Sequence, residues 1–131
     1  MTRPSQPPNV AMGQVWKLPK PQVDALGYPG GGTRYCLVAA VERAVSGEAV
    51  RIWVIVGSTR PGGQPTISVC SGEVGTPKDT HFRFWWTKPI MVSDLPTSGP
   101  VGALRPGRVP EIAACIARSS RFFPLRRLVG R

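Results

Sequence analysis

The sequence has few of the residues that build disulfides, metal sites or catalytic clusters: three cysteines, one histidine and seven acidic residues. Cys36, Cys70 and Cys115 are odd in number and widely spaced, without a C-x-x-C pair or a cluster of histidines. Neither a disulfide framework nor a zinc site is therefore indicated, and we expect no metal and no cofactor. The three cysteines are expected to be small buried hydrophobic residues.

Long apolar segments are also missing. The longest strongly apolar run, residues 52–56, is far too short to span a bilayer. Residues 1–9 are polar and Pro-rich, without the apolar stretch of a secretory signal. These absences, with the few cysteines, favour a protein of the reducing cytoplasm that does not enter a membrane.

Acidic residues are too few to balance the basic ones. Seventeen Lys and Arg oppose seven Asp and Glu, the net charge is +10, and arginines outnumber lysines by thirteen to four. A soluble surface of mixed charge would intersperse acids among the bases, and guanidinium groups suit phosphate. We expect a polyanionic partner, foremost a nucleic acid, with an anionic membrane surface or an acidic protein as alternatives.

The residues that are present fit one folded domain. A length of 131 residues and a hydrophobic fraction of 41% suit a single packed unit, while 15 Gly and 15 Pro require many turns. We expect a flexible Pro-rich arm over residues 1–12, the domain over residues 13–118 and a basic tail over residues 119–131.

Short runs of alternating, branched or aromatic residues predict five strands. These runs are residues 14–18, 35–41, 51–56, 66–70 and 80–86. In the last run His81, Arg83 and Trp85 fall on one face, and the aromatic residues 82, 84 and 86 fall on the other. Pro89 interrupts that ladder, so the continuation through residues 90–92 is expected to be offset by a bulge or to lie at an edge.

Turns and a closing helix complete the predicted fold. A loop is expected from Pro19 to Gly32, and turns are expected at residues 46–48 and 71–73. Pro110 suits the first turn of a helix, and apolar residues at helical spacing give that helix a packing face. The face comprises Val109, Ile112, Ala113, Ile116 and Ala117. The predicted fold is mainly β, a small curled SH3-like barrel with a C-terminal α-helix.

Six short segments between residues 13 and 118 stand in a familiar order. They are Gly13-Gln14-Val15-Trp16, residues 27–34 (Gly-Tyr-Pro-Gly-Gly-Gly-Thr-Arg), Leu37-Val38, Val56-Gly57-Ser58-Thr59, residues 74–83 and residues 102–116. In order and spacing the sequence resembles the MazF/PemK/Kid family of toxins. Each segment is short, so the resemblance rests on their succession along the chain.

The resemblance implies both a fold and an activity. Most members of that family are metal-independent endoribonucleases that cut single-stranded RNA, act as homodimers and are neutralised by an antitoxin, here expected to be acidic. Gyrase poisons share the same barrel. Because a fold does not decide a function, the alternative is a non-catalytic nucleic-acid-binding or gyrase-poison-like, protein-inhibiting barrel.

Metal-free RNA cleavage needs a base, an acid and hydrogen-bond donors for the phosphate. By the family pattern Arg34 is the loop arginine, Ser58 and Thr59 are the hydroxyl pair, and Arg83 is the strand arginine that serves as acid or charge clamp. Their plainer interpretation is that the arginines are solvated charges at strand edges and that the hydroxyls cap a turn.

Four further residues are expected to contact RNA: Tyr28, Thr33, Arg60 and Trp85. An exposed Trp85 could stack a base while Arg83 holds the adjacent phosphate. Trp85 could equally be buried under a loop or at a dimer interface.

The sequence departs from the family pattern where a general base would stand. Pro29 replaces a glutamate found in many relatives, and Tyr28 and Trp85 replace a histidine and an aspartate found in some. His81 is the candidate substitute, because an imidazole titrates near neutrality, although a lone histidine on a strand is more often structural. The carboxylates of Asp79 and Glu73 are weaker candidates.

Overall fold

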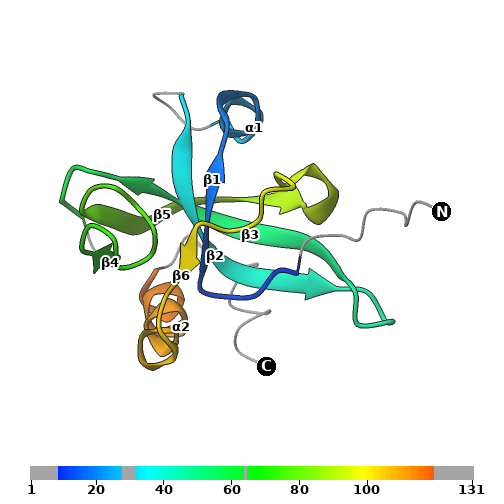
Figure 1. Cartoon of the computed structure of the whole chain (residues 1–131). Helices are drawn as coiled ribbons and strands as arrows, with labels where there is room; N and C mark the ends of the chain where they lie inside the picture. Colours follow the sequence, from blue (N-terminus) through cyan, green and yellow to red (C-terminus); the bar gives the residue numbers. More distant parts are fainter. Residues whose placement is uncertain (1–8, 28–31, 64, 120–131) are drawn as a thin grey trace.

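The computed structural model describes residues 9–27, 32–63 and 65–119. These residues form a curled, antiparallel, six-stranded half-barrel with strand order β4-β5-β3-β2-β1-β6 (Figure 1). The strands are β1 (Gln14–Leu18), β2 (Arg34–Arg43), β3 (Ala49–Ser58), β4 (Thr66–Val69), β5 (Thr80–Met91) and β6 (Gly102–Ala103). The helical segments are α1 (Lys20–Ala25), η1 (Val92–Asp94), η2 (Pro106–Arg108) and α2 (Pro110–Arg118). The expected mainly β fold with a C-terminal helix is confirmed.

The sheet buries apolar side chains on both faces. One cluster, which includes Val15, Leu37 and Ile55, packs with Ile112 of α2. The neighbouring residues in the same strands point to the opposite face of the sheet and form a second cluster. Val23 of α1 belongs to this second cluster. Successive side chains of a strand belong alternately to the two clusters, which is why β2 and β3 are almost continuously apolar.

Helix α1 replaces part of the loop expected after β1. The prediction of a loop throughout this segment was wrong, because Pro21 stands in the first turn of the helix, where proline is tolerated. Val23 and Leu26, three residues apart, are buried in the second cluster. The remainder of the expected loop, residues 28–31, lies outside the described residues.

Strand β5 confirms the predicted alternation over residues 81–84. Phe82 and Phe84 are buried, whereas His81 and Arg83 are partly exposed. The strand continues through Pro89, and its pairing with β3 shifts register between Phe82 and Thr87, so the irregularity precedes Pro89 and residues 87–91 pair continuously with β3. In the described chain β4 pairs with residues 80–83 of β5 only, so Pro89 is flanked by β3 alone.

Two expectations about buried residues need correction. Cys36 and Cys115 are buried, but Cys70 is exposed because it directly follows the short strand β4. On α2 the buried residues are Ile112, Cys115 and Ile116, and both alanines of the expected face are exposed. Helix spacing was therefore predicted correctly, but the buried face of α2 is turned toward Cys115.

The packed part of the chain begins before Gly13. Val10 is 2% exposed and belongs to the second cluster.

Of the helices in the described ranges, none is long and apolar enough to cross a membrane.

Candidate functional site

A hollow of about 170 Å³ lies where β2 and β5 begin and β3 ends. Its described lining residues are Thr33, Arg34, Tyr35, Gly57, Ser58, Thr59, Pro77, Lys78 and Thr80. We call it the cationic hollow, because Arg34 and Lys78 line it and none of these nine lining residues is acidic. Such a surface suits an anionic group of the size of a phosphate.

Gly57 lets the strands meet closely beside the hollow. A Cβ at this position would lie 2.7 Å from Thr80 Cγ2, 2.9 Å from Phe82 Cε1 and 2.9 Å from the main-chain oxygen of Tyr35. Only a residue without a side chain fits this approach. The glycine at the end of an apolar run was visible in the sequence, but its steric role was not.

The cationic hollow brings together four of the predicted site residues: Thr33, Arg34, Ser58 and Thr59. Arg34 begins β2 and Thr33 directly precedes it, whereas Ser58 ends β3 and Thr59 directly follows it. Ser58 also shapes the turn, since its Oγ accepts a hydrogen bond from the main-chain N–H of Arg60 at 3.1 Å. A turn-capping role and a place in the hollow are thus compatible for Ser58.

Two lining residues were missed by sequence reasoning. Lys78 is exposed in the turn before β5, and Tyr35 forms the wall next to Arg34. The ammonium of Lys17 lies 5.9 Å from the centre of the Tyr35 ring, which adds positive charge close to this wall. A lysine in a turn carries no local signal of this role.

His81 and Arg83 lie on β5 and are not among the lining residues of the hollow. His81 pairs in register with Ser58 of β3 on one side and with Ser68 of β4 on the other. We call these three residues the serine–histidine row. Ser58 belongs both to this row and to the hollow, and His81 directly follows Thr80, which lines the hollow, so His81 is adjacent to the hollow.

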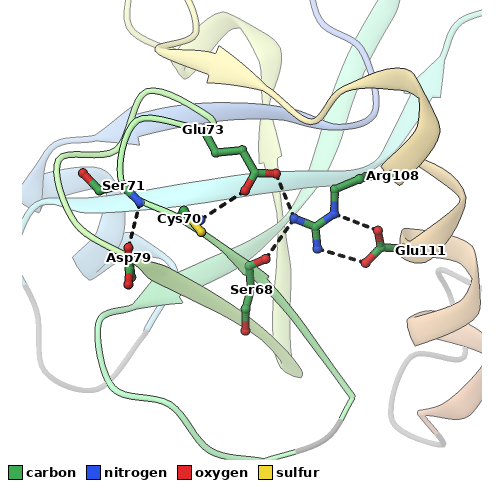
Figure 2. Close-up of polar contacts among 7 residues, drawn as sticks. All are labelled: Ser68, Cys70, Ser71, Glu73, Asp79, Arg108 and Glu111. Carbon is green, nitrogen blue, oxygen red and sulfur yellow. Dashed lines mark hydrogen bonds and ion pairs between the residues drawn. The ribbon is translucent and has the colours of Figure 1, made fainter.

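The two candidate carboxylates are engaged in folding the connection between β4 and β5 (Figure 2). Asp79 Oδ1 accepts a hydrogen bond of 2.8 Å from the main-chain N–H of Ser71. Glu73 accepts one of 3.1 Å from the main-chain N–H of Cys70 and one of 2.9 Å from Arg108. Arg108, and secondly the Cys70 N–H, hold the pKa of Glu73 below its usual range. Neither carboxylate lines the hollow.

Arg108 connects the C-terminal helix with β4. Its guanidinium donates to both oxygens of Glu111, to Glu73 and, at 2.9 Å, to the main-chain oxygen of Ser68 (Figure 2). Hydrogen bonds that Arg108 donates to Glu111, the largest cause, and to Glu73 raise the pKa of Arg108. Glu111 is an i,i+3 neighbour of Arg108, but Glu73 and Ser68 are 35 and 40 residues away in the sequence, so no motif indicates the whole network.

The other predicted RNA-contacting residues are Arg60, Tyr28 and Trp85. Arg60 is exposed just after β3. Tyr28 and Pro29 lie outside the described residues, as does the side chain of Trp85, so the predicted stacking of Trp85 stays a prediction. Among the residues that the structure describes, no three His, Cys, Asp or Glu side chains gather in a group that could hold a metal ion.

Neither a family model nor a curated protein matches the chain.

Proposed function

We propose that the protein is a toxin-type, metal-independent endoribonuclease that holds a phosphate of single-stranded RNA in the cationic hollow. One observation carries the proposal. Arg34 and the hydroxyl pair Ser58 and Thr59, which are distant in the sequence, line a single hollow without an acidic lining residue among those described. Guanidinium and hydroxyl groups are the donors that a crowded, negatively charged phosphate requires.

The proposed reaction is an internal transesterification. The ribose 2′-oxygen attacks the adjacent phosphorus, the bond from phosphorus to the 5′-oxygen breaks, and a 2′,3′-cyclic phosphate and a 5′-hydroxyl result. His81 takes the proton of the 2′-hydroxyl, and the leaving 5′-oxygen takes a proton from solvent. Arg34 and Arg83 stabilise the charge that accumulates on the phosphate.

A second candidate is a barrel that binds RNA, or inhibits a protein, without cutting. The observation that favours it is the absence of a carboxylate from the described lining of the hollow. Asp79 and Glu73 are both occupied by other contacts. This candidate predicts binding that weakens with salt and no cleavage.

The remaining partners are part of the same proposal. An acidic antitoxin would neutralise the toxin by covering the cationic hollow, and the active form is proposed to be a homodimer. Single-stranded RNA occurs in the cytoplasm, where we expect the protein to act.

The test compares three arginine variants on a long single-stranded RNA in EDTA. We expect Arg34→Ala and Arg83→Ala to lower the single-turnover cleavage rate by roughly 10²- to 10³-fold, because the first removes a phosphate donor from the hollow and the second removes the proposed charge clamp on the adjoining strand β5. Arg43→Ala is the matched control: Arg43 is exposed at the other end of β2 and donates to the main-chain oxygen of Gly47. Its rate should stay within about twofold of the wild type.

The outcomes separate the two candidates. Equal rates for all three variants and the wild type would rule out cleavage at the hollow. RNA that is bound but left intact by the wild type, with binding reduced in Arg34→Ala, would replace the first candidate by the second.

A further inference from the structure

We propose that Ser68 is a positioning residue that accepts a hydrogen bond from Nδ1–H of His81 and keeps the Nε2 lone pair available to take the ribose proton. The inference rests on the function proposed above. It adds to that function a residue that sequence reasoning did not single out, and it names the atom of His81 that acts as the base.

The contact is direct. Ser68 Oγ lies 2.7 Å from His81 Nδ1, and the two residues are partners in the register of β4 with β5. Residues opposite each other in an antiparallel pair project from the same face of the sheet. Strand pairing therefore brings the hydroxyl to this edge of the imidazole.

The strand that carries Ser68 is anchored from the opposite side. The main-chain oxygen of Ser68 accepts a hydrogen bond of 2.9 Å from Arg108, which is itself bound to Glu111 and Glu73. Figure 2 shows the Ser68 side chain pointing away from Arg108. Arg108 of η2 thus fixes the backbone at Ser68 and leaves the hydroxyl for His81.

The chemistry of a base decides the direction of the hydrogen bond. A hydroxyl can donate to Nδ1 or accept from it. If Ser68 donated to Nδ1, the neutral ring would carry its proton on Nε2, and its only lone pair would be occupied by the serine hydroxyl, so Nε2 could not take the ribose proton. Ser68 as the acceptor keeps the same contact before and after proton transfer, so the ring need not turn.

The tautomer of His81 can be read without any substrate, because His81 is the only histidine of the chain. We would record the ¹⁵N shifts of the imidazole by NMR at alkaline pH, where an imidazole is neutral. The full chain is compared with Ser68→Ala, with the conservative Ser68→Thr and with Ser93→Ala, an exposed serine after the far end of β5. We expect the Nδ1–H form in the wild type, Ser68→Thr and Ser93→Ala, and its loss in Ser68→Ala.

Single-turnover cleavage of RNA provides the second readout. At saturating RNA, Ser68→Ala should be roughly tenfold slower with an unchanged half-saturating concentration, and Ser68→Thr should recover the rate. An Nδ1–H population equal in Ser68→Ala and in the wild type would overturn the inference. A wild type that cleaves no RNA would instead refute the proposed function, and the NMR comparison would still decide whether Ser68 sets the tautomer.

Discussion

Gly57 has no room for a side chain at the cationic hollow. Gly57→Ala would bring a methyl group to within 3 Å of Thr80, Phe82 and a main-chain oxygen. We expect this overpacking to lower the free energy of unfolding by roughly 1–3 kcal/mol. Gly107→Ala is the matched control, since nothing lies within 4 Å of a Cβ at that position. Urea unfolding of both variants checks the prediction, and equal midpoints would contradict it.

The three cysteines should differ in reactivity. Burial raises the pKa of the Cys36 thiol to about 12 and also raises that of Cys115, whereas Cys70 is exposed. Since the thiolate is the reactive form, the native protein should take up one equivalent of a thiol reagent rapidly and all three after unfolding. Cys70→Ser should abolish the rapid uptake. Rapid uptake that persists in Cys70→Ser would show that a buried thiol is accessible.

At the scale of elements, Arg108 attaches η2 and α2 to β4. Arg108→Ala removes hydrogen bonds to two carboxylates and to a main-chain oxygen. We expect a loss of about 2 kcal/mol in the free energy of unfolding, as is typical of hydrogen bonds to charged groups. Arg105→Ala, at an exposed position just before η2, should be nearly neutral. Urea unfolding of the two variants measures this difference. Equal midpoints would refute this role of Arg108.

The same attachment predicts how stability responds to acid. Arg108 holds the pKa values of Glu73 and Glu111 below the ordinary value of 4.5. A carboxylate with a lowered folded-state pKa contributes stability above its unfolded value and loses it as pH falls through the folded one. The wild type should therefore lose stability below about pH 4.5, and Arg108→Ala should lose less. Denaturant titrations across this pH range measure how steeply the free energy of unfolding falls with pH in each protein. Equal slopes for the wild type and Arg108→Ala would show that the network does not contribute.

Sequence reasoning could predict those elements that are fixed by local patterns. The alternation at residues 81–84 and the start of α2 at Pro110 depend on neighbours in the chain, and both are confirmed. Helix α1 could have been found, because Pro21 fits a first turn and Val23 and Leu26 share a face.

Features decided by tertiary contact could not be predicted. The exposure of Cys70 depends on where β4 ends, and the place of Lys78 in the hollow depends on how β5 approaches β3. The bonds of Arg108 to Ser68 and Glu73 join η2 to β4 and to the connection after it, so no spacing rule reveals them, unlike the i,i+3 pair with Glu111. Likewise the resemblance indicated Arg34 and Ser58, but only the strand register placed His81 between two serines.

At the scale of the whole molecule, a net charge of +10 should dominate RNA affinity. Binding that neutralises phosphates releases counterions, so the logarithm of the association constant should fall linearly with the logarithm of salt concentration. Arg34→Ala should make this slope shallower by roughly 0.7, the value for one phosphate of a single strand. Fluorescence anisotropy over a salt series measures the slope, and an unchanged slope would mean that Arg34 contacts no phosphate.

In the proposed function, the cationic hollow holds the RNA phosphate while the ribose 2′-hydroxyl attacks it. The most direct test incubates the purified protein in EDTA with a single-stranded RNA and with the same strand carrying one 2′-deoxyribose at the mapped cleavage position. We predict cleavage of the first strand to a 2′,3′-cyclic phosphate and a 5′-hydroxyl, and no cleavage at the substituted position of the second. An RNA that stays intact although bound, or equal cleavage of both strands, would contradict the claim.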